Sequence, residues 1–295
     1  MNILNILDEI EKTDADIYDR LSPRRKVMKD FYNAGKKISL AALPLALSSM
    51  FTKAYGQSST TAVNDVLNFA LTLEYLEYHF YNHALLGTDV TFDFPSTAAR
   101  NAITTIRDHE KAHVDLLAGA LGSAARPALA YTNFDFRAGG TYNADNSYAS
   151  GGTFADVYTN YQTFLKVATA FEDTGVRAYK GQAPVLKGNA VLTTALQIHS
   201  VEARHASHLR QMTAAALGVG LKPWITYSAN GNDTGVAPAN PVYAGEQNTM
   251  QAGVEITNIA PGVTQAAAAE SFDEFLTKAQ VVTIANLFLK PAFRL

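Results

Sequence analysis

The chain has 295 residues, a formal net charge of −3 at pH 7, a hydrophobic share of 47% and a charged share of 17%. This composition indicates a globular protein with a sizeable core, in one large domain or two small ones, and it lacks the basic excess of a nucleic-acid-binding surface. The chain contains no Cys. That absence excludes disulfides, thiolate metal sites and a rubredoxin-type iron centre, and it suits an oxidising compartment or a site that handles peroxide.

The N-terminal part of the chain predicts an export signal. Arg24 and Arg25 precede an apolar run at 38–51, which is too short and too interrupted by proline to span a bilayer as a stable helix. A basic region, an apolar region and the small-x-small end Ala54–Gly56 are typical of a secretory signal, and the paired arginines resemble a twin-arginine signal. We therefore expect export to the periplasm or the cell exterior. The alternative is a basic amphipathic helix that stays attached in the cytoplasm.

The middle of the chain shows the apolar spacing of four amphipathic helices. Ser96 is a suitable N-cap for the second of them, and Gly122 and Gly181 are stop signals for the second and third. The predicted helices are Thr60–Leu86, Ser96–Leu121, Phe154–Tyr179 and Pro184–Leu217.

Two long segments without helical spacing follow the second and fourth helices. Residues 123–152 are rich in Gly, Asn, Ser and Ala, and residues 219–268 are rich in Gly, Asn, Pro and Thr, so both predict loops. A last amphipathic helix is expected at Glu270–Leu289, packed on the helical unit or, alternatively, forming an oligomer contact. The predicted parts are an N-terminal segment 1–56, a four-helix unit 57–217 and a C-terminal extension 218–295.

The second and fourth helices carry the same acid–histidine spacing, Glu110-x-x-His113 and Glu202-x-x-His205. Residues three apart on an α-helix lie on nearly the same face, so each carboxylate and imidazole point together. With 7 His residues in the chain, chance predicts fewer than one such pair. One pair alone would suggest only a surface contact on a solvated helix. Carboxylates can bridge two cations, and imidazole suits iron, manganese and zinc.

The helix before each pair adds one more acidic residue. Glu74 in the first helix aligns with Glu172 in the third, and each is followed seven residues later by a Tyr, Tyr81 or Tyr179. The chain thus repeats one half-bundle, and the core would be costly to form if these carboxylates faced one another without a cation. We predict a metal site formed by Glu74, Glu110, His113, Glu172, Glu202 and His205.

Several neighbouring residues leave alternatives open. Glu77 lies one turn from Glu74, but on the repeat it aligns with Gly175, which cannot bind a metal, so Glu74 is favoured. Tyr81 and Tyr179 are expected to pack in the core, and the alternatives are hydrogen bonding to a carboxylate or a redox role. Five histidines remain: His79, His83, His109, His199 and His208. We expect them to lie on helix surfaces or to hydrogen-bond to the metal ligands, and the second role suits His109 and His199 best.

The order Glu, Glu-x-x-His, Glu, Glu-x-x-His resembles that of the ferritin-like di-iron and di-manganese carboxylate proteins. Within that superfamily, Phe69–Glu77 and Phe171–Gly181 look like the ferritin-like domain family that includes desiccation-related proteins. The resemblance covers roughly residues 60–217. The lack of Cys separates the chain from full-length rubrerythrins, and its long C-terminal extension argues against a cage-forming storage shell.

The resemblance implies an all-α ferritin-like four-helix bundle, with a long crossover between the second and third helices and a C-terminal extension with one helix. It also implies two metal ions, iron favoured over manganese. Glu110 and Glu202 would bridge the ions, and the terminal ligands would be Glu74, His113, Glu172 and His205.

Open metal positions would receive a small oxidant, dioxygen or peroxide. We therefore expect an exported oxidoreductase with ferroxidase, catalase-like or oxidase chemistry. The competing hypothesis is a non-catalytic stress or desiccation protein, or a surface assembly subunit. Metal ions and the oxidant are the expected partners, and homo-oligomer formation is left open. Nucleic acid is not expected as a partner, nor is a stable membrane span after processing.

Overall fold

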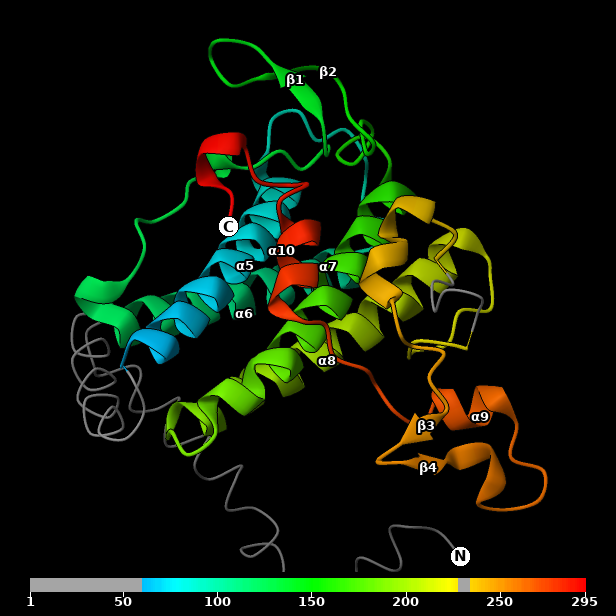
Figure 1. The fold of residues 1–295 in the computed structure, drawn as a ribbon. Helices are drawn as coiled ribbons and strands as arrows, with labels where there is room; N and C mark the ends of the chain where they lie inside the picture. Colours follow the sequence, from blue (N-terminus) through cyan, green and yellow to red (C-terminus); the bar gives the residue numbers. More distant parts are fainter. Residues whose placement is uncertain (1–59, 228–233) are drawn as a thin grey trace, which may run out of the picture. The chain divides into compact units, whose positions relative to one another are not determined.

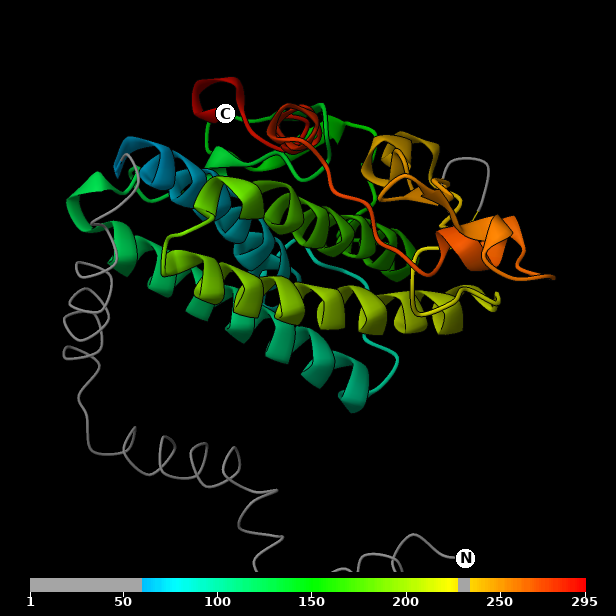
Figure 2. The ribbon, with the colours of Figure 1, turned by 60° about the horizontal axis from the view of Figure 1, so that its bottom comes forward.

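Four long helices form the main body of the structure, a computed structural model that describes residues 60–227 and 234–295. In Figure 2, α6 and α8 lie on one side of the bundle, and α5 and α7 lie on the other. The all-α fold class predicted from the sequence is confirmed. The helices are α5 (Thr60–Leu86), α6 (Thr97–Leu121), α7 (Tyr161–Gln182) and α8 (Val191–Leu217) (Figure 1).

The ends of α6 follow the local signals in the sequence. The Ser96 side chain accepts a hydrogen bond from the backbone N–H of Ala99, satisfying one of the free donors of the first turn. At the other end, Gly122 has a φ of +52° and donates its N–H to the Ala118 carbonyl. A residue with a side chain adopts this backbone conformation at a cost, which explains why the helix stops at a glycine.

The third helix begins later than the predicted Phe154. Asn160 caps α7 by accepting hydrogen bonds from the backbone N–H groups of Gln162 and Thr163. The apolar residues before this cap are buried in turns rather than in a helix. Burial by tertiary packing thus produced a helical spacing where no helix forms. Likewise, Pro184 lies in a short 3-10 helix, Ala183–Leu186, ahead of α8.

The long connection between α6 and α7 confirms the expected crossover and contains an antiparallel hairpin that the sequence did not predict. The hairpin strands are β1 (Gly140–Tyr142) and β2 (Tyr148–Gly151). Near Phe134 the crossover also pairs with the chain after α10: the Asp135 N–H donates to the Phe288 carbonyl over 2.8 Å. The crossover and the C-terminal end therefore stabilise each other on one side of the bundle.

The C-terminal helix is shorter than expected. Among the described residues after Leu217, the α-helical segments are α10 (Lys278–Ala285) and a separate five-residue helix, α9 (Gln265–Ala269), and a small hairpin, β3 (Met250–Gln251) with β4 (Val254–Glu255), precedes them. The helical spacing had relied on Phe272 and Phe275, but their side chains are 42% and 54% exposed. Figures 1 and 2 show α10 lying over α5 and α7.

A fully buried arginine of α7 anchors the extension to the bundle. Arg177 donates from Nε to the Glu274 carbonyl (2.9 Å), from Nη2 to the Ala244 carbonyl (2.5 Å) and from Nη1 to the Val242 carbonyl. Its Nε also lies 3.0 Å from the carboxylate of Glu246, which is buried. These contacts satisfy a charge that could not otherwise be buried at low cost.

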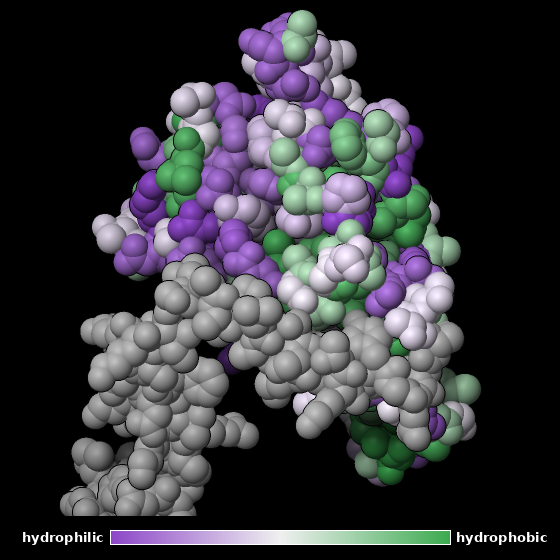
Figure 3. Space-filling view, turned by 90° about the vertical axis from the view of Figure 1, so that its left-hand side faces the viewer, coloured by the Kyte–Doolittle hydropathy of each residue, from purple (hydrophilic) through white to green (hydrophobic). Residues whose placement is uncertain are grey.

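No helix within residues 60–227 and 234–295 is long and apolar enough to cross a membrane. Figure 3 shows one face of the molecule, on which polar residues cover much of one half and hydrophobic residues gather in the other. The predicted signal at residues 1–56 lies outside the described residues, so export stays a prediction.

Candidate metal centre

The structure brings all six predicted ligands together in the interior of the bundle, where the four carboxylates are fully buried. They form two overlapping groups, and within each group one ligand atom per residue lies within 4.8 Å of the others. Glu110 and Glu202 belong to both groups, which is the arrangement that two adjacent cations need. The first group is Glu74, Glu110, His113 and Glu202, and the second is Glu110, Glu172, Glu202 and His205.

Both histidines turn the same ring nitrogen toward the carboxylates. His113 Nδ1 lies 3.1 Å from Glu74, 3.0 Å from Glu110 and 3.2 Å from Glu202. His205 Nδ1 lies 2.9 Å from Glu110 and 3.1 Å from Glu172. Nδ1 is therefore the atom on each ring that could bind a cation.

The second ring nitrogen of His205 has its own partner. His205 Nε2 lies 2.9 Å from Nδ1 of His109, and the two rings stack. When Nε2–H donates to His109, the lone pair of the His205 ring is on Nδ1, facing the carboxylates. His109 thus takes the role expected of it. His199 does not, because its Nδ1 lies 3.0 Å from the Val176 carbonyl.

The other histidines lie away from the cluster. His79 Nε2 is 2.7 Å from the Leu129 carbonyl, and His83 Nε2 is 2.5 Å from Asp89. His208 is exposed on α8. His208 has the surface position expected of it, whereas His79, partly buried against the crossover, lies neither on the surface nor beside a ligand.

The two tyrosines of the repeat hydrogen-bond across the bundle. Tyr81 of α5 donates to Oε1 of Glu172 on α7 over 2.6 Å, and Tyr179 of α7 donates to Oε1 of Glu74 on α5. Burial, followed by the nearby carboxylates, raises the pKa of both phenols well above its usual value, so both remain donors. Each tyrosine fixes one oxygen of a carboxylate and leaves Oε2 directed at a histidine.

The two shared carboxylates are the least satisfied groups of the cluster. Glu110 Oε1 and both oxygens of Glu202 are buried and have no hydrogen-bond partner among the described residues. Histidine nitrogens lie 2.9–3.2 Å from two of these oxygens, but not in hydrogen-bond geometry. A buried carboxylate oxygen without a partner costs free energy. The donor set, carboxylates with imidazoles, fits iron or manganese, and a cation would satisfy these oxygens.

The pKa values of the carboxylates also show that the cluster carries more acidic groups than its two histidines can neutralise. Burial, and then the charges of Glu110, Glu74 and Glu172, raise the pKa of Glu202 well above its usual value. Burial also raises the pKa of Glu110, to about 7. For Glu74, burial raises the pKa, but the charge and hydrogen bond of His113 outweigh it and the pKa is lowered. Without a cation, the cluster therefore holds protons that metal binding would displace.

A fifth carboxylate, Glu77, is buried beside the six predicted ligands. Glu74 rather than Glu77 contacts His113, which agrees with the choice made from the repeat. A Cβ atom at Gly175 would lie 3.2 Å from Glu77 Oε1 and 3.1 Å from Glu202 Oε2. The glycine thus lets α7 approach two carboxylates, a reason for keeping a residue that weakens a helix interior.

We expect Gly175→Ala to lower metal occupancy because the new methyl group crowds Glu202 and Glu77. Gly119→Ala is the matched control: it also lies inside a helix, but its Cβ would meet no atom within 4 Å. The control should keep the metals and gain about 0.5–1 kcal/mol of stability from helix propensity alone. Metal analysis and chemical denaturation of both variants check this. Equal metal content in both would contradict it.

The choice between the two neighbouring glutamates is testable. Glu74→Ala should lose at least one metal ion per chain, because Glu74 contacts His113 and accepts from Tyr179. Glu77→Ala should keep both ions. Metal content after purification without chelator decides between them, and the reverse result would mean that the repeat is aligned one helical turn out of phase.

The fold and the site together define a four-helix carboxylate bundle of the ferritin-like class. A family model described as a ferritin-like domain matches residues 62–215, more than half of the chain, and the protein belongs to that family. The searches of curated proteins and of solved structures found no match.

Proposed function

We propose that the protein is a di-metal oxidoreductase that acts on dioxygen or peroxide, with ferroxidase, catalase-like or oxidase chemistry. The observation that carries this proposal is the sharing of Glu110 and Glu202 between two ligand groups, with buried oxygens that lack hydrogen-bond partners. Two redox metal ions held there, iron favoured over manganese, would supply the two electrons that reduce one oxidant molecule.

The protein's own residues would bind the two metal ions and hold the ligand side chains in position. Glu74, with His113, would hold one ion, and Glu172, with His205, the other, while the two shared carboxylates would bridge them. The tyrosine hydroxyls keep the terminal carboxylates in place, and the apolar core around the ligands excludes bulk water.

The experiment that tests the proposal is turnover. Metal-loaded protein should consume dioxygen over several cycles when an excess of a reductant such as iron(II) re-reduces the metals, or peroxide over several cycles when peroxide serves as both oxidant and reductant. The competing non-catalytic role, in stress protection or surface assembly, predicts no turnover with iron or manganese. Two bound redox metals without a reaction toward either oxidant would contradict the enzyme proposal.

We also propose that the protein is exported by the twin-arginine route, which carries folded proteins and would allow metal loading before export. Replacing Arg24 and Arg25 together by Lys should leave the precursor in the cytoplasm, and mature protein should begin near Gln57. Cell fractionation with N-terminal sequencing measures both. Native protein outside the inner membrane that still carries residues 1–56 would argue against cleavage.

A further inference from the structure

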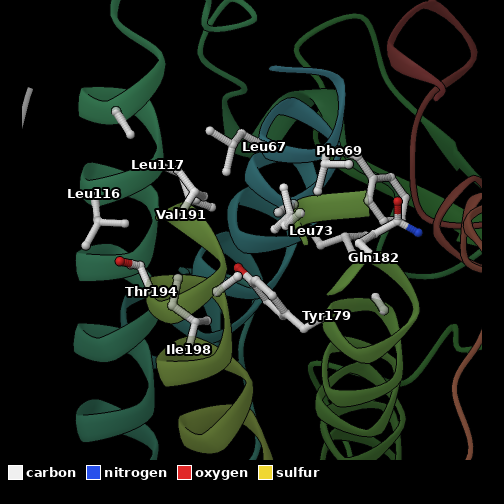
Figure 4. Close-up of a pocket in the computed structure, with 16 residues that line it drawn as sticks. Leu67, Phe69, Leu73, Leu116, Leu117, Tyr179, Gln182, Val191, Thr194 and Ile198 are labelled. Carbon is white, nitrogen blue, oxygen red and sulfur yellow. The ribbon is translucent and has the colours of Figure 1, made fainter. Parts of the chain in front are cut away.

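A wide cleft lies between the bundle and the C-terminal extension. It has a volume of about 360 Å³, and its walls come from α7, α8 and three segments of the extension. Figure 2 shows the α9 region of the extension, in orange, beside the end of α8. The apolar pocket in Figure 4, which Tyr179 and Ile198 help to line, has a volume of only about 20 Å³. Small-molecule sites usually have about 300–1,000 Å³, so the cleft has room for an organic ligand and that pocket does not.

Two exposed aromatic residues line the cleft. Trp224 is 50% exposed and Phe272 is 42% exposed. The indole N–H of Trp224 donates to Glu270 over 2.8 Å, and the ammonium group of Lys222 donates to the same carboxylate over 2.7 Å. These bonds orient the indole ring and balance the charge of Glu270. An exposed, oriented indole can pack against the hydrocarbon part of a ligand or attract its positive charge.

Two buried carboxylates of the cleft have one oxygen each that is not hydrogen-bonded. Asp173 accepts hydrogen bonds from Arg210 and Tyr243 at Oδ2, over 2.7 Å and 2.8 Å. Glu246 accepts one from the backbone N–H of Glu274 at Oε1, over 3.1 Å. Oδ1 of Asp173 and Oε2 of Glu246 accept no hydrogen bond from a described residue. The cleft therefore offers acceptors that a ligand with several donors could use.

A histidine adds another acceptor. His199 lines the cleft, and its Nδ1 lies 3.0 Å from the Val176 carbonyl. A carbonyl oxygen can only accept, so the ring carries its proton on Nδ1 in this contact. In the neutral ring the lone pair is then on Nε2, which can accept a hydrogen bond from a ligand.

The negative charge of the cleft is not fully balanced. Three carboxylates of its lining have an ion-pair partner: Asp173 with Arg210, Glu246 with Arg177 and Glu270 with Lys222. The fourth, Asp273, forms no ion pair or hydrogen bond with a described residue. Burial raises the pKa of Asp273, and the more distant charge of Lys180 offsets this only in part. A single positive charge brought by a ligand would therefore complete the charge balance of the cleft.

We propose that this cleft binds a small organic amine as its ammonium ion. An ammonium group carries one positive charge and only donors, so it matches both the excess of acceptors and the carboxylate of Asp273. A neutral hydroxyl compound would leave that charge unbalanced, and an anion would be repelled. Trp224 and Phe272 would contact the hydrocarbon part of the amine. No predicted metal ligand lines the cleft, so the inference does not depend on the proposed oxidoreductase function.

The test uses the fluorescence of Trp224, which is the single Trp of the chain. The full-length protein is titrated with phenethylamine and, separately, with phenethyl alcohol, a neutral molecule of similar size. At about pH 8 the amine is protonated, and Glu246, whose pKa burial raises to about 7, is ionised. The amine should change the emission saturably and bind at least about tenfold more tightly than the alcohol, because its hydrogen bonds are charge-assisted. Calorimetry repeats both titrations, so that binding without a change in emission is also detected.

Two variants assign the binding to the cleft. Asp273→Asn removes the unbalanced charge and should weaken phenethylamine binding about tenfold or more, and it should fold because Asp273 bonds to no described residue. Asp65→Asn, exposed on α5 and outside the cleft, is its matched control. Ala203→Lys places an ammonium group in the cleft from the exposed side of α8 and should also weaken binding, whereas Ala215→Lys, elsewhere on α8, should not.

Three results would each overturn the proposal. The first is the absence of both heat and a change in emission on adding phenethylamine to wild type. The second is equal affinity for the amine and the alcohol, which would mean that the aromatic residues alone bind the probe. The third is unchanged affinity in Asp273→Asn and Ala203→Lys, which would place the amine outside the cleft.

Discussion

Glu202→Ala is expected to remove both the metal pair and the oxidant chemistry while leaving a folded helical protein. Glu202 belongs to both ligand groups, so its loss affects both positions. Replacing a residue that merely supports a metal ligand commonly costs 10–100-fold in affinity or activity, so a shared ligand should cost more than about 100-fold. The fold should survive because most bundle stability comes from apolar packing. Both oxygens of Glu202 are buried without a hydrogen-bond partner among the described residues.

Two further variants make this prediction specific. His208→Ala, an exposed histidine on the same helix, should retain metals and turnover. Glu202→Gln keeps the side-chain volume and cannot ionise. Because the raised pKa of Glu202 makes folding of the metal-free protein take up a proton, the metal-free variant should unfold at a higher denaturant concentration than metal-free wild type. Circular dichroism, metal analysis and oxidant consumption together measure these effects. Full turnover in Glu202→Ala would place the chemistry elsewhere in the protein.

Of the substitutions proposed for this protein, Arg177→Met should lower the free energy of unfolding the most. The substitution leaves three carbonyl groups without this donor and the buried Glu246 carboxylate without its counter-charge. Breaking a buried ion pair by removing one partner typically costs about 3–5 kcal/mol. We expect the C-terminal extension to detach and become sensitive to protease after Gly218.

The surface substitution Arg204→Met is the control, because Arg204 is exposed on α8. Surface substitutions of this kind usually change the free energy of unfolding by no more than about 0.5 kcal/mol. Removing Glu246 together with Arg177 should recover part of the loss, since no charge is then left buried alone. Denaturant unfolding and limited proteolysis of the full chain test this, and a variant as stable and protease-resistant as wild type would contradict the anchoring role of Arg177.

The ligand set could be predicted from the sequence because helical spacing is local. Glu110 with His113, and Glu202 with His205, must share a helix face wherever the helices lie, and the repeat identified Glu74 over Glu77. The crossed bonds of Tyr81 and Tyr179 could only be an alternative, because they depend on the register between two helices.

Other features needed the three-dimensional structure. Phe272 and Phe275 have helical spacing, yet their side chains are largely exposed on a non-helical segment. The contacts of Arg177 join residues about 65–97 positions apart, which no local pattern reveals.

Metal content tests the central claim most directly. Protein purified without chelator, and then offered iron(II) or manganese(II) under anaerobic conditions, should bind two ions per chain. It should release protons as they bind, because Glu110 has a pKa raised to about 7 and that of Glu202 lies well above its usual value. A correctly folded wild-type protein that binds neither ion would contradict the account of the buried Glu and His cluster as a metal centre.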